Sequence, residues 1–404
     1  MSAAAAPEVA RPGKVSIMTT RLDVRHLITT GADKHPSLAN GVHNVARQIA
    51  REQIAAGYRA RITFVSAVPV LGAGDCELPT EVVPASGVTV FGRVVRLQSK
   101  IIRTLLADAG PQTLFHIHGG REPLLVDLAF RLHRRGIPYV VTVHGRYSHV
   151  YDQSDHCQRR VTALYLTKVE RSLLVKARFV QGVSLHEKRV LQRIAPGARI
   201  EAIGHGAYSS RFDGVPPRPK ARTRSSSFPR FAYCGRYAVW HKGLDLLLKG
   251  FAEYRRHGGH GSLTMIGSGD REPLMRLIRA LDIGDAVEVR GPLFGNDRDL
   301  TLGDCDFFVV ASRFDAGPLT ALESALLGLP LLVTPNTAVS EVVASRGAGI
   351  SIADLTPEAV FAAMREADRL THREWCRHSA AAYQLAVSEG DWTRIAARLL
   401  ELYQ

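Results

Sequence analysis

The sequence contains few cysteines and no long apolar run. Its five cysteines are odd in number and never closely paired, a pattern that fits neither a disulfide framework nor a metal site: Cys76, Cys157, Cys234, Cys305 and Cys376. No stretch approaches the roughly 18 uninterrupted apolar residues of a membrane span. Residues 1–12 also lack the apolar core of a signal peptide. We therefore expect a cytoplasmic protein from a reducing compartment, with a disordered tail over residues 1–13.

The chain also lacks the complete motifs of two large nucleotide-binding classes. A glycine-rich turn, Gly267–Gly269, follows an apolar run, but the full dinucleotide fingerprint is missing and there is no Walker Gly-Lys-Thr/Ser. Nicotinamide enzymes and P-loop NTPases are therefore disfavoured. Metal-ligand spacings of the Cys/His type are absent as well. We expect no metal and no cofactor.

Positive charge is unevenly distributed along the chain. The formal net charge is +14, and the excess lies in the first 230 residues, whereas residues 231–404 carry slightly more acidic than basic side chains. This asymmetry suggests that the N-terminal half faces an anionic surface or ligand, for which membrane phospholipid, a lipid-diphosphate acceptor and nucleic acid are the candidates.

The order of the expected elements predicts two α/β domains. A chain of 404 residues is too long for one ordinary core. In residues 14–205 we expect parallel strands alternating with helices, a surface loop over 68–90 and a basic amphipathic helix at Arg93–Ala109; the strands are Lys14–Thr19, Arg61–Ala67, Thr113–His118, Tyr139–His144, Arg178–Ser184 and Arg199–Ile203. A linker rich in Pro, Ser and Arg follows over 206–230.

A second series of the same kind covers residues 231–388. Its expected strands are Phe231–Arg236, Ser262–Ile266, Ala286–Arg290, Phe307–Ala311, Leu331–Thr334 and Gly349–Ile352. A substrate would be enclosed in the cleft between the two domains. Residues 389–404 end the chain with an amphipathic helix, Trp392–Tyr403.

The stretch Ser312–Gly328 carries the clearest chemistry. It predicts a strand end, a loop containing Asp315 and a helix beginning near Leu319, with Glu323 one turn into that helix. The free N–H groups at the helix start suit a phosphate, and carboxylates suit sugar or ribose hydroxyls. The alternative interpretation is plain helix capping.

Other charged and imidazole side chains follow expected strands. Arg236 lies just past one strand, and Lys242 begins a helix six positions later, a combination suited to diphosphate unless both are solvated surface cations. His118 and His144 each end a strand and precede glycine, which directs them toward a cleft. The alternative for these histidines is a hydrogen-bonded core position.

Together these motifs resemble a known family. Gly235-Arg236 with Lys242-Gly243, the Gly267–Gly269 turn, Asp315 and Glu323 at E-x7-E spacing, Gly328-Leu329-Pro330 and Glu341 occur in the order and rough spacing of the retaining glycosyltransferases of family 4, related to bacterial mannosyl- and glucosyltransferases. The resemblance implies the GT-B fold, with two Rossmann-like domains facing across a cleft and a C-terminal helix that crosses back to the N-terminal domain.

The resemblance also implies roles for single residues. Arg236 and Lys242 would hold the donor diphosphate and assist catalysis, Asp315 would hold the donor sugar, Glu323 would bind the ribose, and His144 would face the reacting centre. Further donor-binding positions would be glycines and the start of the helix after the strand: Gly41, Gly235, Gly267, Gly317, Pro318 and Leu319.

The implied activity is retaining, metal-independent transfer of a hexose. The donor would be a nucleoside-diphosphate sugar and the acceptor a glycan or lipid-linked molecule in cell-surface polysaccharide or glycolipid synthesis. The basic N-terminal half would bind the inner face of the plasma membrane, and we expect no nucleic-acid partner. Two features depart from the family: Asp315 stands where Glu is usual, and Thr337-Ala338 replaces Gly-Gly. A sugar-nucleotide 2-epimerase and a sugar-nucleotide-binding protein with weak or lost activity remain alternatives.

Overall fold

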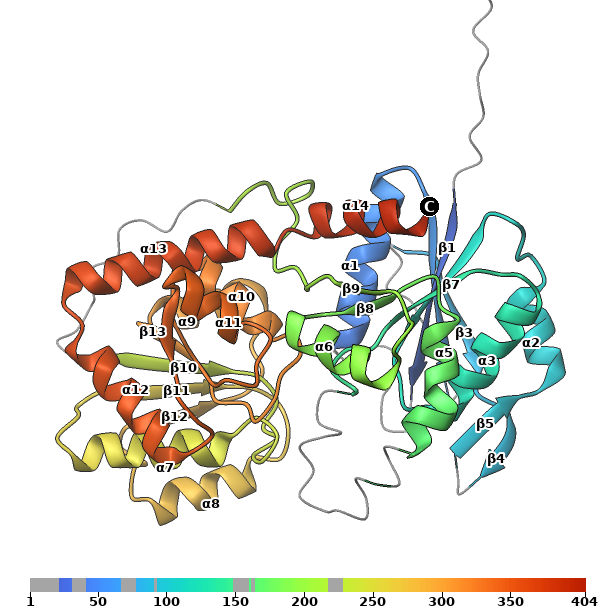
Figure 1. Ribbon diagram of the computed structural model, residues 1–404. Coiled ribbons are helices and arrows are strands. Elements are labelled where there is room, and N and C mark those ends of the chain that lie inside the picture. The colour runs from blue at the N-terminus through green and yellow to red at the C-terminus, as the bar shows by residue number, and fades with distance from the viewer. Residues whose placement is uncertain are drawn as a thin grey trace, which may run out of the picture.

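Two parallel sheets form the framework of the computed structural model, which describes residues 22–30, 41–66, 78–90, 93–147, 160, 164–216 and 228–404. Helices flank both sheets, and the two domains lie next to each other (Figure 1). The expected tail over 1–13 and the expected strand Lys14–Thr19 fall outside the described residues. The prediction of two Rossmann-like α/β domains is confirmed.

The N-terminal sheet is entirely parallel. Its strands lie in the order β3 (Thr80–Pro84), β2 (Arg59–Ser66), β1 (Asp23–Thr30), β6 (Thr113–His118), β7 (Tyr139–Thr142), β8 (Val180–Gly182) and β9 (Ile200–Ala202). Flanking helices are α1 (Gly41–Ala55), α3 (Pro123–Arg134), α5 (Arg171–Val175), α6 (Leu185–Ile194) and a π-helical turn, η1 (Leu166–Glu170). Most of these elements match the predicted ranges within a few residues.

Strand β1 is a correction, because the sequence predicted no strand between Lys14–Thr19 and Arg61–Ala67. Its sequence carries two charged residues and a histidine near its start, which weakens the apolar pattern of a strand. The fold satisfies the charge locally, because the buried guanidinium of Arg25 bonds Asp23 at 3.0 Å and Asp108 at 2.7 Å. Pairing with both β2 and β6 makes β1 an interior strand of the sheet.

Residues 78–109 also differ from the prediction. The expected surface loop contains β3 and β4 (Gly87–Val90), and the expected basic helix begins as strand β5 (Arg93–Leu97) before helix α2 (Ser99–Leu106). β4 and β5 pair as an antiparallel ribbon. The sequence Arg-Val-Val-Arg-Leu at the start of the expected helix is compatible with the periodicity of a helix and with that of a strand. Pairing with β4 selects the strand.

The C-terminal sheet has the strand order β12 (Val287–Arg290), β11 (Ser262–Ile266), β10 (Arg230–Cys234), β13 (Phe307–Val310), β14 (Leu331–Val333) and β15 (Gly349–Ser351), again all parallel. The helices expected to alternate with these strands appear as α7 (Leu244–Arg256), α8 (Glu272–Ala280), α10 (Leu319–Leu326), α11 (Ser340–Arg346) and α12 (Pro357–Arg369). Two helices were not predicted: α9 (Gly295–Gly303), which is mostly polar, and α13 (His372–Glu389).

The last helix crosses back to the N-terminal domain, as predicted. In Figure 1, α13 runs along the C-terminal domain and α14 (Trp392–Tyr403) continues to the N-terminal one. Trp392, Leu399 and Tyr403 of α14 are buried in a cluster with Val24 of β1 and Val45 of α1. Residues 206–216 of the expected linker lead past the α13–α14 junction, where Tyr208 pairs with Asp391. In the part of the chain that the structure describes, no helix has the length and apolar character needed to cross a bilayer.

Candidate active site

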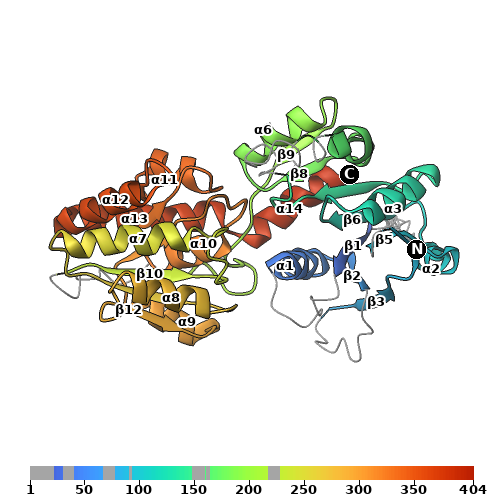
Figure 2. The same cartoon turned by 90° about the horizontal axis from the view of Figure 1, so that it is seen from below.

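A cavity of about 200 Å³ lies beyond the ends of β10 and β13. Eight of the residues predicted to bind the donor or to act in catalysis line it: Gly41, Gly235, Arg236, Lys242, Asp315, Gly317, Pro318 and Leu319. Because Gly41 belongs to α1, the N-terminal domain contributes to the wall, and Figure 2 shows α1 at the edge of its domain that is nearest the C-terminal domain. The cavity thus unites residues far apart in the sequence.

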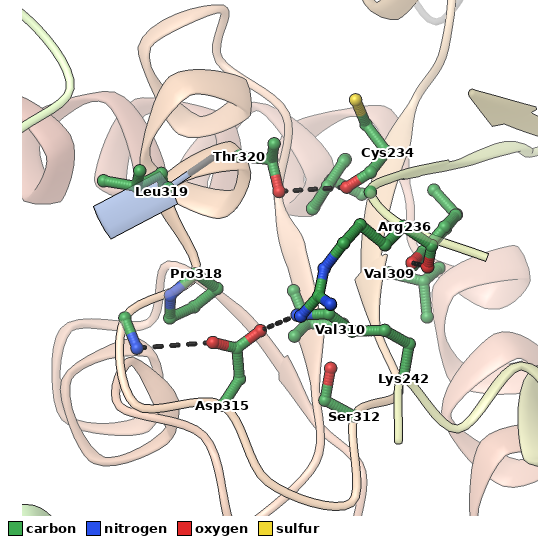
Figure 3. Close-up of a pocket in the computed structure, with 15 residues that line it drawn as sticks. Cys234, Arg236, Lys242, Val309, Val310, Ser312, Asp315, Pro318, Leu319 and Thr320 are labelled. Atoms are coloured by element: carbon green, nitrogen blue, oxygen red, sulfur yellow. Dashed lines mark hydrogen bonds and ion pairs between the residues drawn. The ribbon is translucent and has the colours of Figure 1, made fainter. Parts of the chain in front are cut away.

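Asp315 and Lys242 form the charged centre of this pocket. Lys242 Nζ lies 2.5 Å from Asp315 Oδ2, and both side chains are largely buried. The backbone N–H of Gly317 donates to the other carboxylate oxygen at 3.3 Å, and Figure 3 shows both interactions as dashed lines. The backbone of Asp315 is held by Asn336 and Ala338, so the segment with Thr337-Ala338 in place of Gly-Gly braces the acid.

Arg236 lies on the same wall as Lys242. Its side chain is exposed and reaches into the pocket from the loop after β10 (Figure 3). Gly267 is not part of the wall. It packs behind the loop, where a Cβ would lie 1.9 Å from the carbonyl oxygen of Gly235. Gly267 therefore permits the close approach that shapes the Arg236 loop.

Two helices begin at the pocket. Gly41 is the first residue of α1, and Leu319 is the first of α10, and the Leu319 side chain lies 3.9 Å from where a Cβ of Gly41 would be. Pro318 precedes α10 and provides no side-chain cap for its first N–H groups. Helix N-termini carry partial positive charge. Together with Arg236 and Lys242, they make this pocket suitable for an anion such as a diphosphate.

Glu323 does not line the cavity, in contrast to the grouping expected from the sequence. It lies one turn along α10 and pairs with Arg298 of α9 at 2.8 Å. Burial raises the pKa of Glu323, while the guanidinium of Arg298 opposes that shift. In the pocket wall, burial also raises the pKa of the Cys234 thiol to about 11. The carboxylate of Glu323 therefore lies next to the guanidinium of Arg298. No sequence motif indicated this cation, because the sequence did not predict helix α9.

His144 lies at the contact between the domains rather than in the pocket wall. It follows β7 with a φ of 49°, an unusual value for a residue other than glycine. Its Nε2 lies 3.0 Å from His118 Nδ1, and its ring faces that of His205 at 5.4 Å. Burial, aided by His205 and Arg146, holds the pKa of His144 well below its usual range.

Small residues allow the two domains to meet beside His144. A Cβ on Gly145 would lie 2.7 Å from the Cβ of Ala316, and one on Gly317 would lie 2.4 Å from His205 Nδ1. The loop after β7 therefore touches the loop that carries Asp315. Sequence reasoning missed His205, although its position two residues after an expected strand is a usable signal.

Glu341, part of the motif set, lies elsewhere. Its carboxylate bonds the guanidinium of Arg189 on α6 at 2.7 and 3.1 Å, an exposed pair that joins the two domains. Both Glu341 and His205 line a second cavity between the domains.

Family models match two segments of the chain. Residues 39–211 match the model described as Glycosyltransferase Family 4, and residues 228–367 match Glycosyl transferases group 1. A glycogen synthase of Mycobacterium tuberculosis is 24% identical over 274 residues, which cover 66% of this chain and 63% of that protein. The match thus spans less than two thirds of the curated relative.

Solved structures share the whole fold at low sequence identity. Sucrose-phosphate synthase from Thermosynechococcus elongatus has a TM-score of 0.74 at 17% identity, covering 95% of this chain and 98% of that one. A glycosyltransferase from Rickettsia africae gives 0.72 at 16% identity, with the same coverage. Anabaena HepE, solved in complex with UDP and glucose, gives 0.69 at 14% identity and covers 95% and 99%.

Proposed function

This chain belongs to the family 4 glycosyltransferases of GT-B fold, and from that membership we propose that it transfers a hexose from a nucleoside-diphosphate sugar to a glycan or lipid-linked acceptor. One observation carries the proposal: two cations, an acid and the starts of two helices line a single cavity between the domains. Such a cavity suits a ligand with a diphosphate at one end and hydroxyls at the other.

Arg236 and Lys242 would bind the diphosphate and neutralise the charge that develops on it as the glycosidic bond breaks. Because these two side chains supply positive charge at the leaving group, we expect transfer to proceed without an added metal ion. Asp315 would hold the donor sugar, and the product would retain the anomeric configuration of the donor. Gly267 would act indirectly, by shaping the Arg236 loop.

The nucleotide end would extend toward Glu323. Its carboxylate, beside Arg298, would accept hydrogen bonds from ribose hydroxyls, most strongly in the ionised form. Anabaena HepE, which shares the fold, was solved with UDP and glucose bound, so UDP-glucose is the first donor to test. GDP- and ADP-sugars are the next donors to test.

The acceptor would be membrane-linked glycan or lipid. Supporting this, Val88 and Val90 on the β4–β5 ribbon are 56% and 46% exposed, and the exposed cations Arg96, Lys100 and Arg103 lie on β5 and α2. Apolar and basic side chains on elements that follow one another in the chain suit an anionic membrane surface. The protein should bind vesicles that contain phosphatidylglycerol and should lose this binding at high salt. Vesicle binding that changes neither with anionic lipid nor with salt would oppose the proposal.

The decisive experiment measures donor binding and turnover in the same protein. Thermal-shift screening identifies the nucleotide, and product analysis by NMR then gives the acceptor linkage and the anomeric configuration. Arg236→Ala and Glu323→Ala should each lower kcat/KM by roughly 10-fold to 100-fold, whereas Arg279→Ala, an exposed cation on α8, should not. Near-normal turnover in both site variants would end the assignment.

Two alternatives predict different results in that assay. An epimerase would convert the donor to its epimer with no acceptor present. A binding protein would bind a sugar nucleotide and leave it unconsumed with every acceptor tried.

A further inference from the structure

A continuous path of hydrogen bonds runs from the contact between the domains through the N-terminal sheet. We call it the histidine chain, and its members in order are His144, His118, His26, Gln53, Tyr403, His116, Thr142, Gln181 and the carbonyl of Ile203. From His118 to Ile203 the members are buried. Nothing in the proposed reaction accounts for so many buried imidazoles.

The far end of the histidine chain fixes its direction. Gln181 Nε2 bonds the backbone oxygen of Ile203 at 2.9 Å, and that oxygen can only accept. The amide oxygen of Gln181 must therefore accept from the Thr142 hydroxyl, 2.7 Å away. Because the Thr142 hydroxyl donates its one proton to Gln181, its oxygen must accept from His116 Nε2, 2.6 Å away. His116 thus carries its proton on Nε2.

The middle of the histidine chain passes through the C-terminal helix. Burial holds the pKa of His116 well below its usual range, so the ring is neutral and its Nδ1 must accept. The donor is the hydroxyl of Tyr403 on α14, at 2.6 Å. Tyr403 in turn accepts from Gln53 Nε2 at 3.4 Å, which leaves Gln53 Oε1 to accept from His26 Nε2 at 2.9 Å.

The near end then has a single solution. Burial lowers the pKa of His26 to about 4, so this ring is also neutral, and its Nδ1 accepts from His118 Nε2 at 2.9 Å. The neutral ring of His118 has a lone pair on Nδ1 that accepts from His144 Nε2 at 3.0 Å. His144 is left with a proton on Nε2 and a lone pair on Nδ1.

We propose that the histidine chain is a positioning device that holds His144 in its Nε2–H tautomer, and that Tyr403 is the residue through which the C-terminal helix completes it. The left-handed backbone at His144 fits this role, because strained conformations persist where surrounding structure fixes them. The consequence for the reaction rests on the proposed function: a ligand hydroxyl that reaches Nδ1 of His144 can only donate to it, because Nδ1 has no proton to give to a leaving group.

The histidine chain is not a proton relay. Its last member is an amide carbonyl, which accepts a hydrogen bond but does not take up a proton at neutral pH. Reversing the direction of every bond would require Ile203 O to donate. The path can therefore orient His144 but cannot carry a proton away from it.

A metal ion is the competing explanation for three of these residues. His26, His116 and His118 each offer a nitrogen within 4.8 Å of the others. In the histidine chain, however, the Nδ1 lone pair of each ring already accepts a hydrogen bond, from His118, Tyr403 and His144 respectively. Metal binding and the histidine chain are thus mutually exclusive.

The tautomer can be read directly in protein labelled with ¹⁵N-histidine. We expect long-range ¹H–¹⁵N spectra to show His144 protonated on Nε2 alone between about pH 6 and 8. The groups around it are His118 on β6, His205 after β9, Arg146 on its own loop and Glu187, which is bonded to Gly145. Asp315 on the facing loop acts on His205. A proton on Nδ1, or a cationic ring, would overturn the inference.

Two variants interrupt the histidine chain at different points, and each has a matched control. Tyr403→Phe removes the hydroxyl between Gln53 and His116, and Tyr139→Phe removes an equally buried hydroxyl that bonds Leu173. Thr142→Val removes the link to Gln181, and its control is Thr63→Val on β2, a buried threonine outside the path.

We expect Tyr403→Phe and Thr142→Val to populate both tautomers of His144 and to lower kcat/KM about threefold to tenfold. The controls should change neither. A single Nε2–H tautomer in both interrupting variants would overturn the inference, as would stoichiometric zinc that shifts the signals of His26, His116 and His118. If the tautomer is as expected but no sugar nucleotide is consumed, the glycosyltransferase proposal fails and the histidine chain stands.

Discussion

Lys242 and Asp315 are bound to each other in the pocket, with 2.5 Å between the ammonium nitrogen and a carboxylate oxygen. One residue is assigned to the diphosphate and the other to the sugar, so a single ion pair connects the two ends of the proposed donor. A substitution that removes the charge of Asp315 is therefore expected to alter binding of the donor's diphosphate as well as binding of its sugar.

Replacing Asp315 should separate binding from turnover. Asp315→Asn removes the partner of Lys242, and the uncompensated ammonium then attracts an anion more strongly. We expect the free nucleoside diphosphate to bind at least as tightly as to the wild type, while kcat falls about 10-fold to 100-fold because the sugar loses its acceptor. Calorimetry with the nucleotide and a turnover assay measure the two effects.

Lys242→Met is the counterpart of that variant and should weaken nucleotide binding. Lys249→Met, on the exposed side of α7, provides the control. If Asp315→Asn and Lys242→Met weaken the nucleotide equally, the two residues do not divide the donor as proposed.

Arg298→Met should make nucleotide affinity depend on pH. Burial already raises the pKa of Glu323, and Arg298 opposes that rise. Without the guanidinium the pKa of Glu323 rises further, so more of the carboxyl is protonated as pH falls, and the protonated group accepts hydrogen bonds from the ribose more weakly. As pH falls, the affinity of the variant should therefore decline relative to that of the wild type.

Calorimetry over a series of pH values tests this, with Arg279→Met on the surface of α8 as the control. Affinities of Arg298→Met that follow those of the wild type throughout would show that Glu323 does not bind the nucleotide in ionised form.

The sequence predicted those parts of the pocket whose residues directly follow or precede a helix or strand in the chain. Arg236, Lys242 and Asp315 each follow or precede a regular element, and parallel strands end at a common edge of the sheet, so these side chains converge without further information. The same reasoning found α10 and its first residue, Leu319.

Other parts depend on distant partners and leave no local pattern. β1 contains Arg25, whose charge is neutralised by Asp108 after α2, a contact between residues 83 positions apart. Arg298 meets Glu323 only because α9 and α10 are neighbours. In the histidine chain, Tyr403 reaches His116 across 287 positions, which no periodicity or motif records.

Gly145→Ala should disturb the contact between the domains more than the fold. Gly145 has a φ of 78°, so alanine costs about 1 kcal/mol in backbone strain, and its Cβ would also lie 2.7 Å from Ala316. Gly136→Ala is the matched control, with a φ of 67° and no neighbour within 4 Å. We expect similar losses of stability, but a drop in kcat/KM of about 10-fold or more for Gly145→Ala alone. Equal activities would show that the two loops need not touch during turnover.

Glu187 should make stability depend on pH. Its buried carboxylate accepts from the N–H groups of Gly145 at 2.6 Å and Val183 at 2.8 Å, yet burial raises its pKa from 4.5 to about 7. The folded protein therefore binds the proton more tightly than the unfolded chain. This contribution to stability is fully present below the unfolded pKa and is lost as pH rises through about 7.

Glu187→Gln removes this titration, so the difference in unfolding free energy between variant and wild type isolates it from every other group. From about pH 4.5 to pH 8 the wild type should lose up to about 3 kcal/mol relative to Glu187→Gln. Glu358→Gln, an exposed substitution on α12, should show no such trend. Urea unfolding at a series of pH values provides the measurement. A wild type that gains stability relative to Glu187→Gln as pH rises would mean that the two N–H groups outweigh burial, and that the loop carrying His144 is held by a permanently charged carboxylate.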